Sequence, residues 1–116
     1  YNASPESMKA ALSVLSSAEG RKIAVLGDML ELGSDSEDLH RKVALEAGRT
    51  ADVLIFVGDM AELSASSCGR ECSVFSADEK ADAAGYLGSI LKSGDTVLFK
   101  ASNRLHFEDI IKEAGL

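Results

Sequence analysis

Two stretches of the chain decide its fold: residues 22–33 read KIAVLGDMLELG, and residues 52–64 read DVLIFVGDMAELS. In each stretch a short, nearly unbroken apolar run leads into Gly-Asp-Met. Such a run is typical of a parallel strand that is buried on both faces. Gly permits a tight turn after the strand, and Asp can accept hydrogen bonds from the backbone amides beyond it. The repeat therefore predicts two successive strand–turn–helix units.

The remaining elements continue this alternation in both directions. Ser4 and Pro5 predict a capped helix start ahead of the first strand, and Ser34 with Glu37 predicts a capping box that opens the next helix. Further strands are expected over residues 72–75 and 95–100, with helices between and after them. Strands separated by helices imply a parallel sheet covered on both faces. We expect an α/β fold, a Rossmann-like three-layer sandwich with a mainly parallel sheet.

Composition excludes several classes of protein. The 116 residues suit one domain, and 19 acidic against 12 basic residues give a net charge of −7, which disfavours nucleic acid held by phosphate contacts. No apolar run approaches the ~20 residues that span a bilayer, so no membrane insertion is expected. The first residues lack the features of a secretory signal. Cys68 and Cys72 lack the spacing and partners of a zinc site, which favours a reduced pair in a cytoplasmic protein.

Polar residues follow several of the predicted strands. Ligands of open α/β sheets bind where the strands end, and Lys100 would place a cation at this edge near Asp28. Without a ligand, such a lysine would form a salt bridge or would be solvated. Ser102, Asn103 and Arg104 then offer a hydroxyl, an amide and a guanidinium ahead of a helix. Such groups suit carboxylate or phosphate binding.

The chain lacks a complete catalytic set. It contains no G-x-x-x-x-G-K-[ST] phosphate loop, no G-x-G-x-x-G and no G-x-S-x-G. His40 and His106 each lie in the first turns of a predicted helix, where a surface or capping role is expected. We therefore predict no catalytic residue and no metal site within these 116 residues.

One alternative function rests on three residues. Asp28 and Asp59 end two strands and Lys100 ends the last, an arrangement similar to the phospho-acceptor pocket of receiver-type signalling domains. Receivers, however, usually begin with the strand, carry paired acids at its end and place proline after the lysine, whereas Ala101 follows Lys100 here.

Longer motifs suggest a more specific resemblance. The segments YNASPESMKAAL (1–12), IAVLGDMLELG (23–33), Ser36-x-x-x-His40 and TVLFKASNRLHFEDII (96–111) resemble the C-terminal domain of the Mur ligases, and among them the members that add D-alanyl-D-alanine. The resemblance covers nearly the whole chain. It implies that residues 1–116 are the third domain of a longer three-domain enzyme, whose central domain carries the phosphate loop and metal ligands.

The implied reaction is ATP-dependent amide formation in cytoplasmic peptidoglycan precursor synthesis. An acyl phosphate forms on UDP-N-acetylmuramoyl-tripeptide, and the amine of D-alanyl-D-alanine attacks it. ATP and Mg²⁺ would be bound mainly by the central domain, so the isolated chain is expected to be inactive. The C-terminal domain would help to bind ATP and the dipeptide, and would close the active site with the upstream domains as its partners.

The resemblance also implies site residues. Nucleotide contacts are expected at Asn2 and Ser4. Substrate contacts are expected at five polar residues near the strand ends: Asp28, Glu31, Lys100, Ser102 and Arg104. By this interpretation GDMLELG is the functional copy of the repeat, and GDMAELS is chiefly a turn of the same design. The diamino acid of the stem peptide and the oligomeric state stay open.

Overall fold

The computed structural model describes residues 3–101 and 108–116 of the chain. Helices and strands alternate after the first helix, in the predicted order. Two short 3-10 turns, Gly33–Asp35 and Ala77–Glu79, precede the second and fourth helices. The elements are α1 (Pro5–Ser16), β1 (Lys22–Gly27), α2 (Ser36–Thr50), β2 (Val53–Val57), α3 (Ala61–Ser67), β3 (Ser73–Phe75), α4 (Lys80–Ile90), β4 (Thr96–Lys100) and α5 (Glu108–Glu113).

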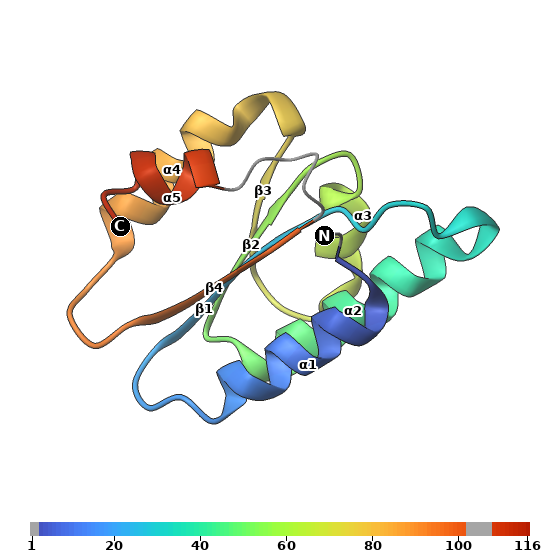
Figure 1. The fold of residues 1–116 in the computed structure, drawn as a ribbon, viewed down its shortest axis with the longest axis horizontal. Coiled ribbons are helices and arrows are strands. Elements are labelled where there is room, and N and C mark those ends of the chain that lie inside the picture. The colour runs from blue at the N-terminus through green and yellow to red at the C-terminus, as the bar shows by residue number, and fades with distance from the viewer. Residues whose placement is uncertain (1–2, 102–107) are drawn as a thin grey trace.

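The four strands form one sheet in the order β3-β2-β1-β4, and each neighbouring pair is parallel. Helices α1, α2 and α3 cover one face of this sheet, while α4 and α5 cover the other (Figure 1). The predicted α/β class and the Rossmann-like three-layer sandwich are confirmed.

The core has two halves because the side chains of a strand point alternately to the two faces. In β1, Ala24 and Leu26 pack into the cluster that includes residues of α1, α2 and α3. Ile23 and Val25 pack into the cluster beneath α4 and α5. The run KIAVLG is nearly all apolar because both faces of β1 are buried in the core.

The sheet has a topological switch beside β1. The chain adds β2 and β3 on one side of β1, whereas β4 returns to its other side. After β1 the chain enters α2 on one face of the sheet, and α5 lies on the opposite face (Figure 1). In open α/β sheets, ligands bind in the crevice at such a point. A ligand is therefore expected at the carboxyl ends of β1 and β4.

The predicted capping box at the start of α2 is wrong. Ser34 lies inside the 3-10 turn Gly33–Asp35, and α2 begins only at Ser36. No side chain caps either element with a hydrogen bond. Gly33 has a φ of 66°, which redirects the chain before the helix. The sequence alone does not show that Ser34 lies in a 3-10 turn and not at the N-cap of α2.

An ion pair fastens the start of β4 to the start of β1. The Arg21 guanidinium donates to both Asp95 carboxylate oxygens, at 3.0 and 2.6 Å, and to the carbonyl of Ile90. The Asp95 carboxylate also accepts the backbone N–H of Lys92 at 2.8 Å. The hydrogen bond from Arg21, and secondarily that from Lys92, lowers the pKa of Asp95 below its ordinary value of 3.8.

We expect the Asp95 ion pair to make stability depend on acidity. Because its pKa is lowered in the folded chain, its contribution is fully present above the unfolded value near 3.8 and is lost as the pH falls below it. Thermal unfolding should show Asp95→Asn less stable than wild type at pH 7, with a smaller gap at pH 3. Asp38→Asn, at a carboxylate that is 75% exposed and paired with the exposed Arg41, is the control and should differ little from wild type at pH 7.

Candidate functional site

Three of the predicted site residues lie at one edge of the sheet, beside the switch at β1. Lys100, the last residue of β4, is in register with Leu26 of β1, two residues before Asp28. Helix α1 runs back along the sheet, so its first turn lies at this same edge (Figure 1). Ser4 caps that turn. The structure thus brings Ser4, Asp28 and Lys100 to one edge of the sheet, as the sequence predicted.

The Asp28 carboxylate joins the two copies of the repeat. It is 7% exposed, and its two oxygens accept the backbone N–H groups of Asp59 and Met60, each at 2.9 Å. Gly58, at a φ of 132°, lies so close that an added Cβ would stand 2.5 Å from the Asp28 Oδ1 atom. The first Gly-Asp-Met therefore binds the backbone of the second. This contact is architectural, and the predicted substrate contact of Asp28 stays a prediction.

His40 holds the segment that follows β1. Its ring is 4% exposed, its Nε2 atom lies 3.0 Å from the backbone nitrogen of Met29, and its Nδ1 atom lies 2.7 Å from the carbonyl oxygen of Ser36. The prediction of a surface or capping histidine is wrong. The burial of His40 did have a signal, because it shares the buried stripe of α2 with Val43, Ala44 and Ala47. Sequence reasoning missed the role of the ring because its partner, the N–H of Met29, belongs to the preceding loop.

We call residues 28–36 the edge loop. Glu31 is exposed at its tip and has a φ of 60°, a left-handed conformation that is uncommon for a residue with a Cβ. A cavity of about 320 Å³ lies beside it, lined by residues 28–33, Ser36, Asp59 and Met60. The exposed residues Glu31 and Asp59 therefore line a shallow hollow, while the Asp28 carboxylate is occupied by backbone amides. Exposed carboxylates at such a hollow suit a cationic group.

Lys100 is half-buried and faces the α1 layer of the sandwich. Leu98, two residues earlier on β4, packs against the α1 side, while Val97 and Phe99 pack against the α4 side. Alternation along the strand therefore directs Lys100 toward the layer that holds the first turn of α1. A cation in this position is suited to an anionic substrate group.

The cap predicted at Ser4 is present in the structure. The Ser4 hydroxyl accepts the N–H of Ser7 at 3.1 Å, and the Ser7 hydroxyl accepts the N–H of Ser4 at 2.8 Å, which confirms the predicted cap. The nucleotide contact predicted for Ser4 stays a prediction. Three further predicted contacts lie outside the described residues: Asn2, Ser102 and Arg104.

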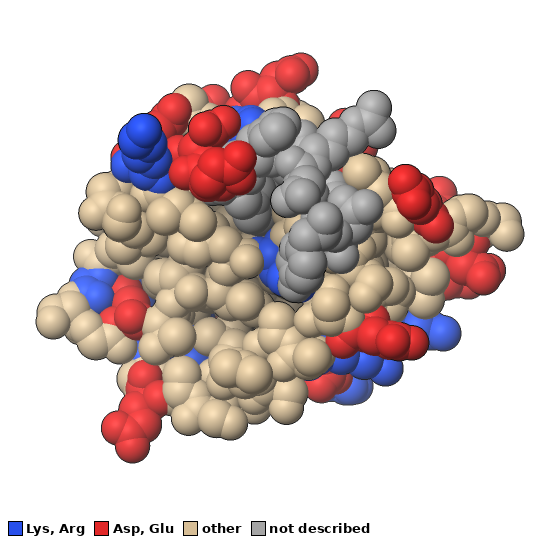
Figure 2. Space-filling view, viewed as in Figure 1, with Lys and Arg blue, Asp and Glu red and all other residues tan. Residues whose placement is uncertain are grey.

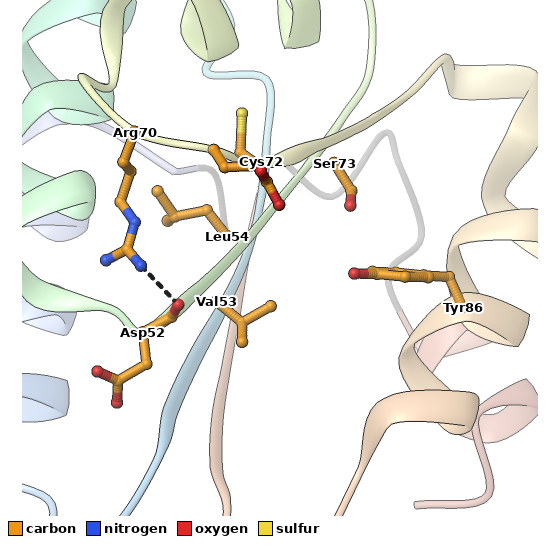
Figure 3. Close-up of a pocket in the computed structure, with 8 residues that line it drawn as sticks. Asp52, Val53, Leu54, Arg70, Cys72, Ser73 and Tyr86 are labelled. Carbon is orange, nitrogen blue, oxygen red and sulfur yellow. Dashed lines mark hydrogen bonds between the residues drawn. The ribbon is translucent and has the colours of Figure 1, made fainter.

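A second, smaller cavity lies at the beginning of β2 and β3 and has a volume of about 170 Å³. Figure 3 shows Arg70 and Tyr86 reaching toward it from opposite sides, over Val53 and Leu54. The Arg70 guanidinium donates to the Asp52 carbonyl at 2.8 Å, so it fastens the chain that enters β2. This contact gives the arginine a structural role.

The two cysteines are free thiols, as predicted. Their sulfur atoms lie 3.7 Å apart, and Cys72 lines the second cavity. Burial, followed by the hydrogen bond with Cys68, raises the pKa of Cys72 to about 11. The Cys72 thiol is therefore almost fully protonated at neutral pH, which makes it a poor nucleophile and a poor metal ligand.

The described residues contain neither a cluster of metal ligands nor a membrane-spanning helix. Within residues 3–101 and 108–116, no three His, Cys, Asp or Glu side chains lie close enough to hold a metal ion. In the same ranges, no helix has the length and apolar character needed to cross a bilayer. Acidic side chains are spread over several parts of the visible face, which disfavours nucleic acid held by phosphate contacts (Figure 2).

The receiver alternative is wrong. Receiver-type domains have the flavodoxin-like strand order 2-1-3-4-5, whereas the order here is 3-2-1-4, the first part of the Rossmann order. The Asp28 carboxylate, which would take part in the acidic pocket, is buried against the amides of Asp59 and Met60. Asp28, Asp59 and Lys100 therefore share a sheet edge without forming a phospho-acceptor pocket.

Comparison with known proteins agrees with this topology. Residues 1–103 match the family described as Mur ligase, glutamate ligase domain. A UDP-N-acetylmuramoyl-tripeptide–D-alanyl-D-alanine ligase from Bacillus subtilis is 37% identical over 97% of this chain and 26% of its own length. The crystal structure of a MurF ligase from Thermotoga maritima in complex with ADP superposes with a TM-score of 0.86 at 30% identity, over 98% of this chain and 26% of that one.

A second solved structure, of MurF from Acinetobacter baumannii, has a TM-score of 0.83 at 28% identity and covers 98% of this chain and 26% of its own. The chain thus spans about a quarter of the length of the relatives that it matches.

Proposed function

The chain belongs to the family of Mur ligase glutamate ligase domains, and on that premise we propose that it is the C-terminal domain of a longer, three-domain enzyme. That enzyme would be an ATP-dependent ligase that joins D-alanyl-D-alanine to UDP-N-acetylmuramoyl-tripeptide in peptidoglycan precursor synthesis, in the cytoplasm. The observation that carries the proposal is the meeting of an acidic loop and a lysine at the switch beside β1, within a chain 37% identical to such a ligase.

The chemistry of the edge matches the groups that the reaction brings together. The attacking dipeptide carries an ammonium group when it arrives, and Glu31 offers a carboxylate beside the hollow of the edge loop. The tripeptide carboxylate and the phosphates of ATP are anionic, and Lys100 offers a cation. We assign Ser102 and Arg104 to the same anionic groups, and Asn2 and Ser4 to the nucleotide.

Mg²⁺ and the phosphate loop belong, in this proposal, to the upstream domains. Within the described ranges no cluster of three potential ligands exists for a metal ion, so these residues do not fit a resident Mg²⁺ site. The chain would instead close over the substrates held upstream. Closure would exclude water and so protect the acyl phosphate from hydrolysis.

The test is a ligation assay on the full-length protein. ATP, UDP-N-acetylmuramoyl-tripeptide and D-alanyl-D-alanine are supplied, phosphate release is followed, and the amide product is identified by mass spectrometry. The full-length protein should form product, whereas the purified 116 residues should not. Absence of product from the intact enzyme would refute the proposed function, and ligation by the 116 residues alone would refute the division of labour.

Within the full-length enzyme, we expect Lys100→Met to lower kcat/KM at least ~10-fold, the scale of one lost charged contact at ~1.4 kcal/mol. Methionine keeps an unbranched apolar side chain, so the change removes mainly the charge. Lys42→Ala, at an exposed position on α2, is the control and should stay near wild type. Equal activity of Lys100→Met and wild type would remove Lys100 from the site.

A further inference from the structure

We propose that His40 is a positioning residue, which holds the edge loop in the shape that presents Glu31 to the amine substrate. The first half of this inference concerns the backbone and stands on the geometry of the loop. The second half, the effect on the amine substrate, rests on the proposed function.

The imidazole bridges the two ends of the edge loop. Its Nε2 atom accepts the N–H of Met29, at the first turn of the loop, so this nitrogen carries no proton. The proton is then on Nδ1, which donates to the carbonyl of Ser36, where α2 begins. A neutral ring with one donor and one acceptor thus ties residue 29 to residue 36, and both of its polar atoms are satisfied.

A second buried side chain, that of Asp28, also holds the edge loop in place. Asp28 ties the beginning of the loop to the turn after β2, through the amides of Asp59 and Met60. Between the anchors at residues 28, 29 and 36, the chain carries Glu31 in its left-handed conformation. Such a conformation persists only when the surroundings enforce it, and it often occurs where function requires it.

These contacts predict that loss of His40 affects the binding of one substrate more than that of the other. Without the bridge, Met29 N–H is left unpaired in a buried place, and Glu31 is free to relax toward the negative φ that residues with a Cβ prefer. The Glu31 carboxylate would then leave the rim of the hollow. In the proposed function, the residues assigned to ATP and its phosphates lie outside residues 28–36. Loss of His40 should therefore weaken binding of the dipeptide more than binding of ATP.

The experiment compares three variants of the full-length enzyme. His40→Leu removes both hydrogen bonds, His40→Gln can still accept the Met29 N–H with its side-chain oxygen, and His40→Asn can reach only toward Ser36. For His40→Leu and His40→Asn we expect the KM for D-alanyl-D-alanine to rise at least ~10-fold and the KM for ATP to change less than ~2-fold. His40→Gln should recover most of the wild-type KM.

A backbone measurement separates this inference from the proposed function. Hydrogen exchange followed by mass spectrometry on the same proteins should show faster exchange over residues 28–36 in His40→Leu than in wild type, with protection restored in His40→Gln. Unchanged exchange in His40→Leu would overturn the anchoring role. Changed exchange with an unchanged dipeptide KM, or with both KM values raised alike, would overturn the positioning role. A wild-type enzyme without ligase activity would refute the proposed function, while exchange would still decide the anchoring.

Discussion

Replacing Asp28 with alanine is expected to lower the free energy of unfolding of the chain by about 3 kcal/mol or more. The carboxylate is buried and accepts two backbone N–H groups, and hydrogen bonds to a charged group are worth about 1.5–3 kcal/mol each. Its removal also leaves the amides of Asp59 and Met60 without their partner. Urea unfolding of wild type and variant, followed by circular dichroism, measures the difference.

The internal repeat supplies the matched control. Asp59 occupies the same place in the second copy, but its side chain is exposed, so Asp59→Ala should change stability by about 0.5 kcal/mol or less. Asp28→Asn should fall between the two, because an amide has one oxygen for two N–H donors. Similar losses for Asp28→Ala and Asp59→Ala would show that the carboxylate does not link the two turns.

The fold could be predicted because its signals are local. The apolar runs that begin at Ile23 and Val53 need two covered faces, and the Gly-Asp pairs after them mark where the strands end. Once the strands are parallel, their carboxyl ends must share an edge, which places Asp28 near Lys100 without any knowledge of coordinates. That part of the candidate site therefore follows from the sequence.

The remaining features of the site depend on contacts between segments. Two Gly-Asp-Met turns at one edge are equivalent in sequence, so the sequence does not show which carboxylate binds the other turn. In the structure it is Asp28 that accepts the amides of the second turn. The burial of His40 follows the helical period of α2, but its hydrogen bond with the Met29 N–H joins two segments and has no signal within either of them. The left-handed conformation of Glu31 likewise has no signal in the sequence, because residues with a Cβ rarely adopt it.

Replacing Gly58 with alanine is the second change expected to have a large effect, about 3 kcal/mol or more of destabilisation. Its φ of 132° is a conformation that residues with a Cβ rarely adopt, which costs about 1–3 kcal/mol. The added Cβ would also stand 2.5–2.7 Å from three atoms of the Asp28 carboxyl group. The carboxylate would have to move and would lose the two N–H groups that it accepts.

Gly33→Ala separates these two causes. Gly33 also has a positive φ, 66°, but an added Cβ would meet nothing within 4 Å, so only backbone strain applies and the expected cost is about 1–2 kcal/mol. Urea unfolding of both variants measures the difference. Equal destabilisation by the two substitutions would mean that the Asp28 carboxylate moves away from the new methyl group and keeps its two hydrogen bonds.

A double-mutant cycle then tests whether the two copies of the repeat act as one unit. If Gly58→Ala acts partly by displacing the Asp28 carboxylate, that part cannot be lost again once Asp28 is already alanine. The double variant should therefore be destabilised by less than the sum of the single changes, by at least about 1 kcal/mol, within the range seen for residues in contact. Additive losses would mean that Gly58 is required only for its backbone conformation. A coupled result would mean that glycine follows β2 because a carboxylate from the other turn occupies the space of its side chain.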